Sequence, residues 1–126
     1  MAKQSPVFVF GNENNWLAVG EGVERKLLGF GPDLLMMHMK FKKGGVGYIH
    51  KHPHRQVSYI ESGSFEVNIA SEKKVQNAGD CYYVPADLEH GVLALEDGTL
   101  IDVFTPCRDD IVAAHEQEIA ASKKSE

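Results

Sequence analysis

Cysteine is nearly absent from this sequence of 126 residues, which has only two thiols, Cys81 and Cys107. Two cysteines cannot form the disulfide framework of a small secreted domain. No apolar run is long enough to span a bilayer, and the first residues lack the apolar segment of a secretion signal. The formal net charge of −5 argues against nucleic acid or an anionic membrane as a partner. We therefore expect a cytoplasmic protein with free thiols.

Long helical periodicity is also missing before residue 109. Short runs with period-two alternation dominate instead, and turns rich in Gly, Asn, Asp and Pro separate them. Many short strands without interspersed helices indicate an antiparallel sandwich or barrel. The sequence therefore predicts one all-β domain over 1–126, with its core at about 34–106. The expected strands are 7–10, 34–41, 48–52, 56–60, 65–69, 81–84, 92–95 and 100–104, with a hairpin tip at 71–74.

The last segment, 109–126, has a different character. Asp109 and Asp110 precede a run rich in alanine, as the dipole at the start of a helix favours. The segment has little apolar surface, so we expect a short helix or a partly disordered tail that packs weakly. His115 within it is expected to be solvated.

Half of the six histidines fall within five residues, at His50, His52 and His54. Residues i and i+2 of a strand point to the same face, so His50 and His52 would aim two imidazoles at one point, as a metal ion requires. Gln56 could add an amide oxygen. With His54 as a ligand instead, the amide position would fall on Ser58, so we place His54 beside the site or in solvent. A set of ordinary surface histidines is the alternative interpretation.

The spacing of these residues forms a two-part pattern. The segment Gly44–Gly63 reads G-x5-H-x-H-x3-Q-x6-G, and the segment Gly79–His90 reads G-x5-P-x4-H. This pattern resembles the two motifs of the cupin family. The resemblance implies a small jelly-roll barrel of two sheets. It also implies a divalent metal held by His50, His52, Gln56 and His90.

Three positions depart from the usual cupin motifs, and one of them is Ala94, which stands where asparagine is usual. Asp87 stands where glycine is usual, and aspartate tolerates the left-handed conformation better than most residues. Gln56 stands where glutamate is usual. Three neutral imidazoles and a neutral amide leave the full charge on a divalent ion, which strengthens it as a Lewis acid and favours anionic ligands. Imidazole-rich sites suit Ni, Zn, Mn, Fe or Cu, so the metal stays open.

A second group of residues lies in the predicted strand 100–104 and just beyond it. Asp102 and Phe104 would share one face, and Arg108 follows shortly after. An acid in an apolar strand is costly unless it is paired or functional. Asp102 could act as a general acid or base, Arg108 could grip a carboxylate, and Phe104 could pack on a sugar ring. The structural alternative is an Asp102–Arg108 salt bridge with Phe104 in the core.

The segment Gly98–Asp110, taken with the histidine motifs, resembles the pectin-degradation cupins of the KdgF type. That family converts 4,5-unsaturated monouronates to linear 4-deoxy-5-keto uronates. The resemblance implies a metalloenzyme with an anionic sugar substrate and with Asp102, Phe104 and Arg108 as its catalytic residues. A metal-dependent dioxygenase and a non-catalytic sugar-binding cupin are the alternatives. The fold also suggests a homodimer formed through free edge strands.

Overall fold

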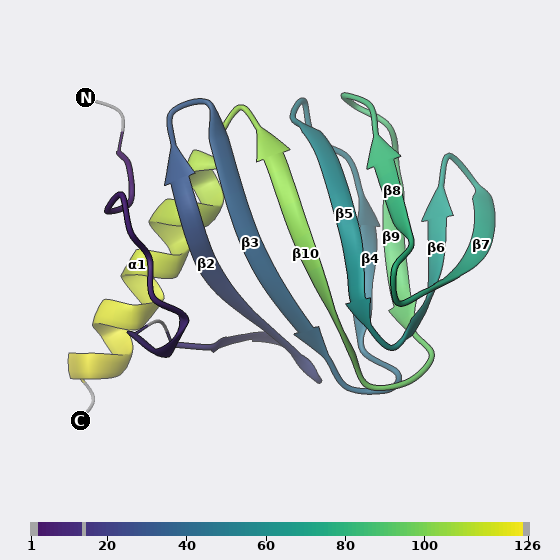
Figure 1. Ribbon diagram of the computed structural model, residues 1–126, viewed down its shortest axis with the longest axis horizontal. Helices are drawn as coiled ribbons and strands as arrows, with labels where there is room; N and C mark the ends of the chain where they lie inside the picture. Colours follow the sequence, from purple (N-terminus) through teal and green to yellow (C-terminus); the bar gives the residue numbers. More distant parts are fainter. Residues whose placement is uncertain (1–2, 14, 125–126) are drawn as a thin grey trace.

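A computed structural model of the chain describes residues 3–13 and 15–124. It contains two antiparallel sheets and one long helix (Figure 1). The elements are η1 (Gly11–Glu13), β1 (Leu17–Gly20), β2 (Val23–Gly31), β3 (Leu34–Phe41), β4 (Val46–His50), β5 (Arg55–Ser62), β6 (Ser64–Ile69), β7 (Glu72–Asn77), β8 (Cys81–Val84), β9 (His90–Ala94), β10 (Gly98–Thr105) and α1 (Asp109–Lys124).

The two sheets differ in size. The six-stranded sheet has the order β1-β2-β3-β10-β5-β8, and the four-stranded sheet has the order β4-β9-β6-β7. The small sheet packs on one part of the inner face of the large sheet. Phe65, Ile60 and Leu100 are buried between them, and the rings of Phe41 and Phe65 meet edge to face at 5.3 Å. The predicted all-β jelly roll of two sheets is confirmed.

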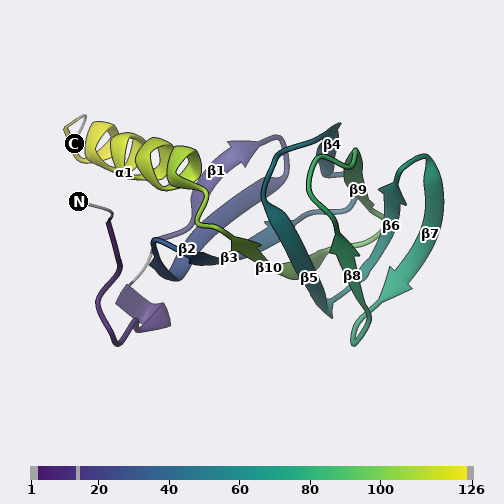
Figure 2. The same cartoon turned by 90° about the horizontal axis from the view of Figure 1, so that it is seen from above.

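Helix α1 covers another part of the same inner face (Figures 1 and 2). Val112, only 3% exposed, packs with Leu35, Met37 and Phe104 in a second apolar cluster. The prediction of a weakly packed tail was therefore wrong, because a few apolar side chains aligned on one helical face suffice to dock it. His115 is also buried rather than solvated.

Strand register places the polar residues of interest side by side. In the β5–β10 pair, Gln56 lies opposite Phe104 and Ser58 lies opposite Asp102. All four side chains are buried on the inner face of the large sheet. The predicted alternation in β3 and β10 is confirmed, because Leu35, Met37, Leu100, Asp102 and Phe104 are likewise buried there.

Two local predictions were wrong, and two strands near the start of the chain were not predicted. Residues 7–10 form no strand in the structure, and Val7 and Phe8 are 91% and 77% exposed. Alternation of apolar residues is therefore not sufficient for a segment to pair with a neighbouring strand. The tip of the β6–β7 hairpin is Ala70–Ser71, both with positive φ, because Ile69 already pairs with Glu72. Strands β1 and β2 were missed, since consecutive charges and glycines hide the alternation of β2.

Two turns behave as the motifs predict. Asp87, at the position where cupins usually have glycine, has a φ of 63° and so adopts the left-handed conformation. Gly63 closes the first motif with a φ of +83°, and a Cβ there would lie 2.6 Å from the Asp97 carbonyl oxygen.

Cys81 and Cys107 are both free thiols. Within the described part of the chain, no helix is both long and apolar enough to cross a membrane.

Candidate metal centre

Three imidazoles converge between the two sheets. His50 ends β4 and His90 begins β9, and the two residues face each other in the strand register. His52 lies in the loop after β4, so the idea of an H-x-H pair on one strand was only half right. The ligand nitrogens of the three side chains all lie within 4.8 Å of one another. The three imidazoles are thus brought together by two strand ends and a loop, and not by alternation along one strand.

Backbone carbonyls fix the orientation of each ring. The Nδ1 atoms of His50, His52 and His90 lie 2.7, 2.9 and 2.9 Å from the carbonyl oxygens of Tyr48, His54 and Leu88. A carbonyl can only accept, so each Nδ1 carries the proton and each Nε2 keeps a lone pair. A hydrogen bond from the other ring nitrogen is the usual support of a metal-bound histidine.

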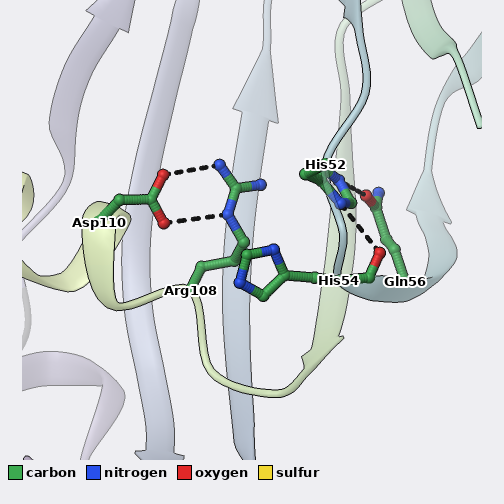
Figure 3. A network of polar contacts seen from close by, with 5 residues as sticks. All are labelled: His52, His54, Gln56, Arg108 and Asp110. Carbon is green, nitrogen blue, oxygen red and sulfur yellow. Dashed lines mark hydrogen bonds and ion pairs between the residues drawn. The ribbon is translucent and has the colours of Figure 1, made fainter. Parts of the chain in front are cut away.

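Gln56 directs its amide oxygen at the same point. Its Oε1 atom lies 3.1 Å from the Nε2 atoms of both His52 and His90 (Figure 3 shows the contact with His52). Burial lowers the pKa of His52, and it lowers the pKa of His90 to about 4, so both rings are neutral at physiological pH. Lone pairs therefore face a carbonyl oxygen with no proton between them. A cation resolves this contact, and the donor set of imidazole nitrogen and amide oxygen fits a divalent transition metal.

The amide nitrogen of Gln56 begins a buried line of hydrogen bonds. It donates to the Ser58 hydroxyl at 2.8 Å, and this hydroxyl donates to Asp102 Oδ1 at 2.5 Å. The Ser58 acceptor fixes which end of the Gln56 amide faces the histidines. Ser58 is not among the residues predicted for the site, although its place two residues after Gln56, on the same strand face, is a signal that could identify it.

Asp102 is a buried carboxyl group, 7% exposed on the inner face of β10. Burial raises the pKa of Asp102 to about 6, and the hydrogen bond from Ser58 opposes this shift in part. Near neutral pH both protonation states are accessible. A group with these properties can accept and release a proton.

Arg108 and Phe104 flank the histidines. Arg108 donates from Nε and one Nη to the two carboxylate oxygens of Asp110, at 3.1 and 2.9 Å (Figure 3). Its guanidinium carbon lies 5.4 Å from the centre of the Phe104 ring, which meets His52 edge-on at 5.6 Å. The structural alternative is half right: Phe104 belongs to the second apolar cluster, but the carboxylate that Arg108 contacts is Asp110 and not Asp102.

A cavity of about 310 Å³ connects these groups. It is lined by residues predicted from the sequence, and also by Arg25 of β2 and Ile111 of α1, which sequence reasoning missed. His54 lies beside the site, where its carbonyl oxygen accepts from His52 and its ring meets the His52 ring edge-on at 5.6 Å. His38 lies elsewhere, 2.8 Å from Glu61. The predicted residues in the lining are His50, Gln56, His90, Asp102, Phe104 and Arg108.

Removing one imidazole tests the metal site. We expect His90→Ala to weaken metal binding by more than the ~10–100-fold that loss of an outer hydrogen-bond partner costs. His38→Ala, away from the cluster, is the matched control. Metal content of the purified variants by plasma mass spectrometry, followed by competition with a chelator, measures the effect. Equal metal retention in His90→Ala and the control would contradict the assignment.

The sequence and the fold both match known proteins. A family model described as Cupin domain matches residues 37–104. The pectin degradation protein KdgF of Dickeya dadantii (strain 3937) is 42% identical over 103 residues, which cover 80% of this chain and 94% of that protein.

Two solved structures support the same relationship. A crystal structure of an RmlC-like cupin from Shewanella frigidimarina NCIMB 400 shares 42% identity at a TM-score of 0.84, covering 86% of this chain and 97% of that one. The structure of KdgF from Halomonas sp. shares 38% identity at a TM-score of 0.81, covering 85% and 99%. The chain therefore belongs to the cupin family and, within it, to the family of the pectin degradation protein KdgF.

Proposed function

We propose that this protein is a metal-dependent enzyme that converts 4,5-unsaturated monouronates to linear 4-deoxy-5-keto uronates. The observation that carries the proposal is the buried carboxyl of Asp102, joined through Ser58 to the amide that faces the imidazole cluster. Similarity to a protein named for pectin degradation supports the same substrate class. The cavity also holds arginine side chains, as recognition of an anionic sugar requires.

The reaction requires one group that can both accept and donate a proton. Ring opening breaks the bond between C1 and the ring oxygen while the C1 hydroxyl loses its proton. The former ring oxygen is left as an enolate, which becomes a ketone when C4 gains a proton, so no net proton is consumed. Asp102, with its pKa near 6, can accept the first proton as a carboxylate and return one as an acid.

The neighbouring side chains bind and orient the sugar. The metal, held by His50, His52, Gln56 and His90, supplies a Lewis acid for an oxygen of the substrate. Arg108, pre-oriented by Asp110, offers its remaining donors to the sugar, and Phe104 offers an apolar ring face. Ni, Zn, Mn and Fe are all compatible with these ligands, and we propose one of them as the ion.

We further propose a homodimer, for which the outer face of the large sheet offers a surface. Strand register aligns Met36, Val103, Val57 and Tyr83 in one row across four strands. Three of them, Met36, Val57 and Tyr83, are 40–53% exposed and form an apolar stripe, whose burial would stabilise a dimer.

We expect wild-type protein to elute at dimer mass and Val57→Lys at monomer mass in size-exclusion chromatography with light scattering. Monomer mass for the wild type would contradict the proposal.

Turnover tests the proposed reaction. Metal-loaded wild-type protein should accelerate the loss of alkene ultraviolet absorbance of an unsaturated monouronate, with and without oxygen. Asp102→Asn should lower kcat by about 10²–10⁴-fold, because the amide cannot transfer the proton. Asp33→Asn, in an exposed turn, is the matched control.

Each result has a separate meaning. A wild-type rate no higher than that of buffer would refute the proposed activity. A strict need for oxygen would point to a dioxygenase. Undiminished turnover by Asp102→Asn, with its metal retained, would refute the role of Asp102 alone.

A further inference from the structure

Arg25 is a charged side chain on the inner face of the large sheet. Its neighbours on that face of β2 are Val23, buried in the main core, and Leu27, which packs against the second apolar cluster. Arg25 lines the same cavity as His90 and Asp102. The Arg25 side chain is half-buried, so its guanidinium is only partly solvated and a compensating charge would stabilise it.

The direct contact of Arg25 orients its side chain without forming an ion pair. Its Nε donates to Nδ1 of His115 at 3.2 Å. His115 belongs to α1 and is itself 8% exposed. Among the described residues, no carboxylate lies within ion-pair distance of Arg25. Burial lowers the pKa of Arg25, a sign that its charge is poorly solvated.

Arg108 presents the opposite case. Asp110 occupies its Nε and one terminal nitrogen, so its positive charge is already matched. After burial, which lowers it, the pKa of Arg25 is raised by the charges of Glu118 and Asp110 and lowered to a smaller extent by that of Arg108. An anion bound in the cavity would give Arg25 the direct charged partner that these more distant carboxylates do not.

We propose that Arg25 binds the carboxylate of the sugar substrate and that His115 positions it for this task. The proposal rests on the proposed function for its substrate class. The Arg25 guanidinium has a fork of donors suited to a carboxylate, and His115 holds the Nε edge. Helix α1 therefore takes part in substrate binding through a positioning residue as well as through the cavity wall.

Kinetics of paired variants test the role of Arg25. Loss of a charge-assisted contact predicts that Arg25→Gln raises KM by about 10- to 100-fold, with a much smaller change in kcat. Arg25→Lys should restore part of the affinity. Lys26→Gln is the matched control, because it removes the same charge at the next position, whose side chain lies over the outer Trp16 ring. Thermal unfolding of all variants confirms that each is folded.

His115 variants test the positioning contact. His115→Leu removes the acceptor for Arg25 Nε and should raise KM by about 2- to 10-fold, as the loss of one hydrogen bond does. His115→Gln keeps an oxygen acceptor and should restore the wild-type KM. If His115 had only a structural role, both variants would be less stable than the wild type, and neither would have a raised KM. An equal KM in all three proteins would overturn the positioning role.

Binding of sugars that are not turned over separates this inference from the proposed reaction. Calorimetry of the metal-loaded protein should show preference for D-galacturonate over neutral D-galactose, and Arg25→Gln should lose that preference. If preference depends on Arg25 while no unsaturated uronate is turned over, the proposed reaction fails and the carboxylate site stands. If wild-type protein turns over the uronate but Arg25→Gln keeps its KM and its sugar preference, the inference is overturned. Absence of any preference in the wild type also counts against it.

Discussion

The hydrogen bonds from Gln56 through Ser58 to Asp102 join the two halves of the site. At one end, the amide oxygen faces the lone pairs of His52 and His90, an arrangement that a cation satisfies. At the other end lies a carboxyl group whose burial raises its pKa to about 6. The hydroxyl between them accepts from one side and donates to the other, so the orientation of each group fixes the next. The line is buried, and a low dielectric makes each of these bonds stronger and each missing partner more costly.

Three separate parts of the fold position this line and its surroundings. Strands β5 and β10 place Gln56, Ser58, Asp102 and Phe104 by their register, while the small sheet brings His50 and His90 from the opposite layer. Helix α1 covers the remaining part of the inner face and holds Arg25 through His115. The cavity lies where these three parts meet. Because no single segment contains the whole site, its chemistry depends on the packing of the small sheet and the helix on the large sheet.

Much of this could be predicted from the sequence, for identifiable reasons. The motif spacing indicated the fold and the converging histidines, and alternation placed Asp102 and Phe104 on the buried face. Long-range contacts were beyond such patterns: Arg108 pairs with Asp110 rather than Asp102, and His115 packs against Arg25 instead of facing solvent. The charges beside Arg25 in β2 concealed both the strand and the inward side chain. Local periodicity thus predicts which face of a sheet a side chain lies on. The residue that it contacts from a distant segment depends on strand register and packing.

The central claim is that Asp102 is a buried group with a raised pKa, able to carry a proton. Its ordinary pKa of 3.8 is raised to about 6 in the folded protein, so folding favours the protonated form and wild-type stability falls as pH rises between these values. Asp102→Asn cannot ionise and escapes this loss. Denaturant unfolding of metal-free wild type and Asp102→Asn from pH 4 to pH 7 should show the variant gaining about 2 kcal/mol relative to the wild type. A difference that stays constant over this range would contradict the account.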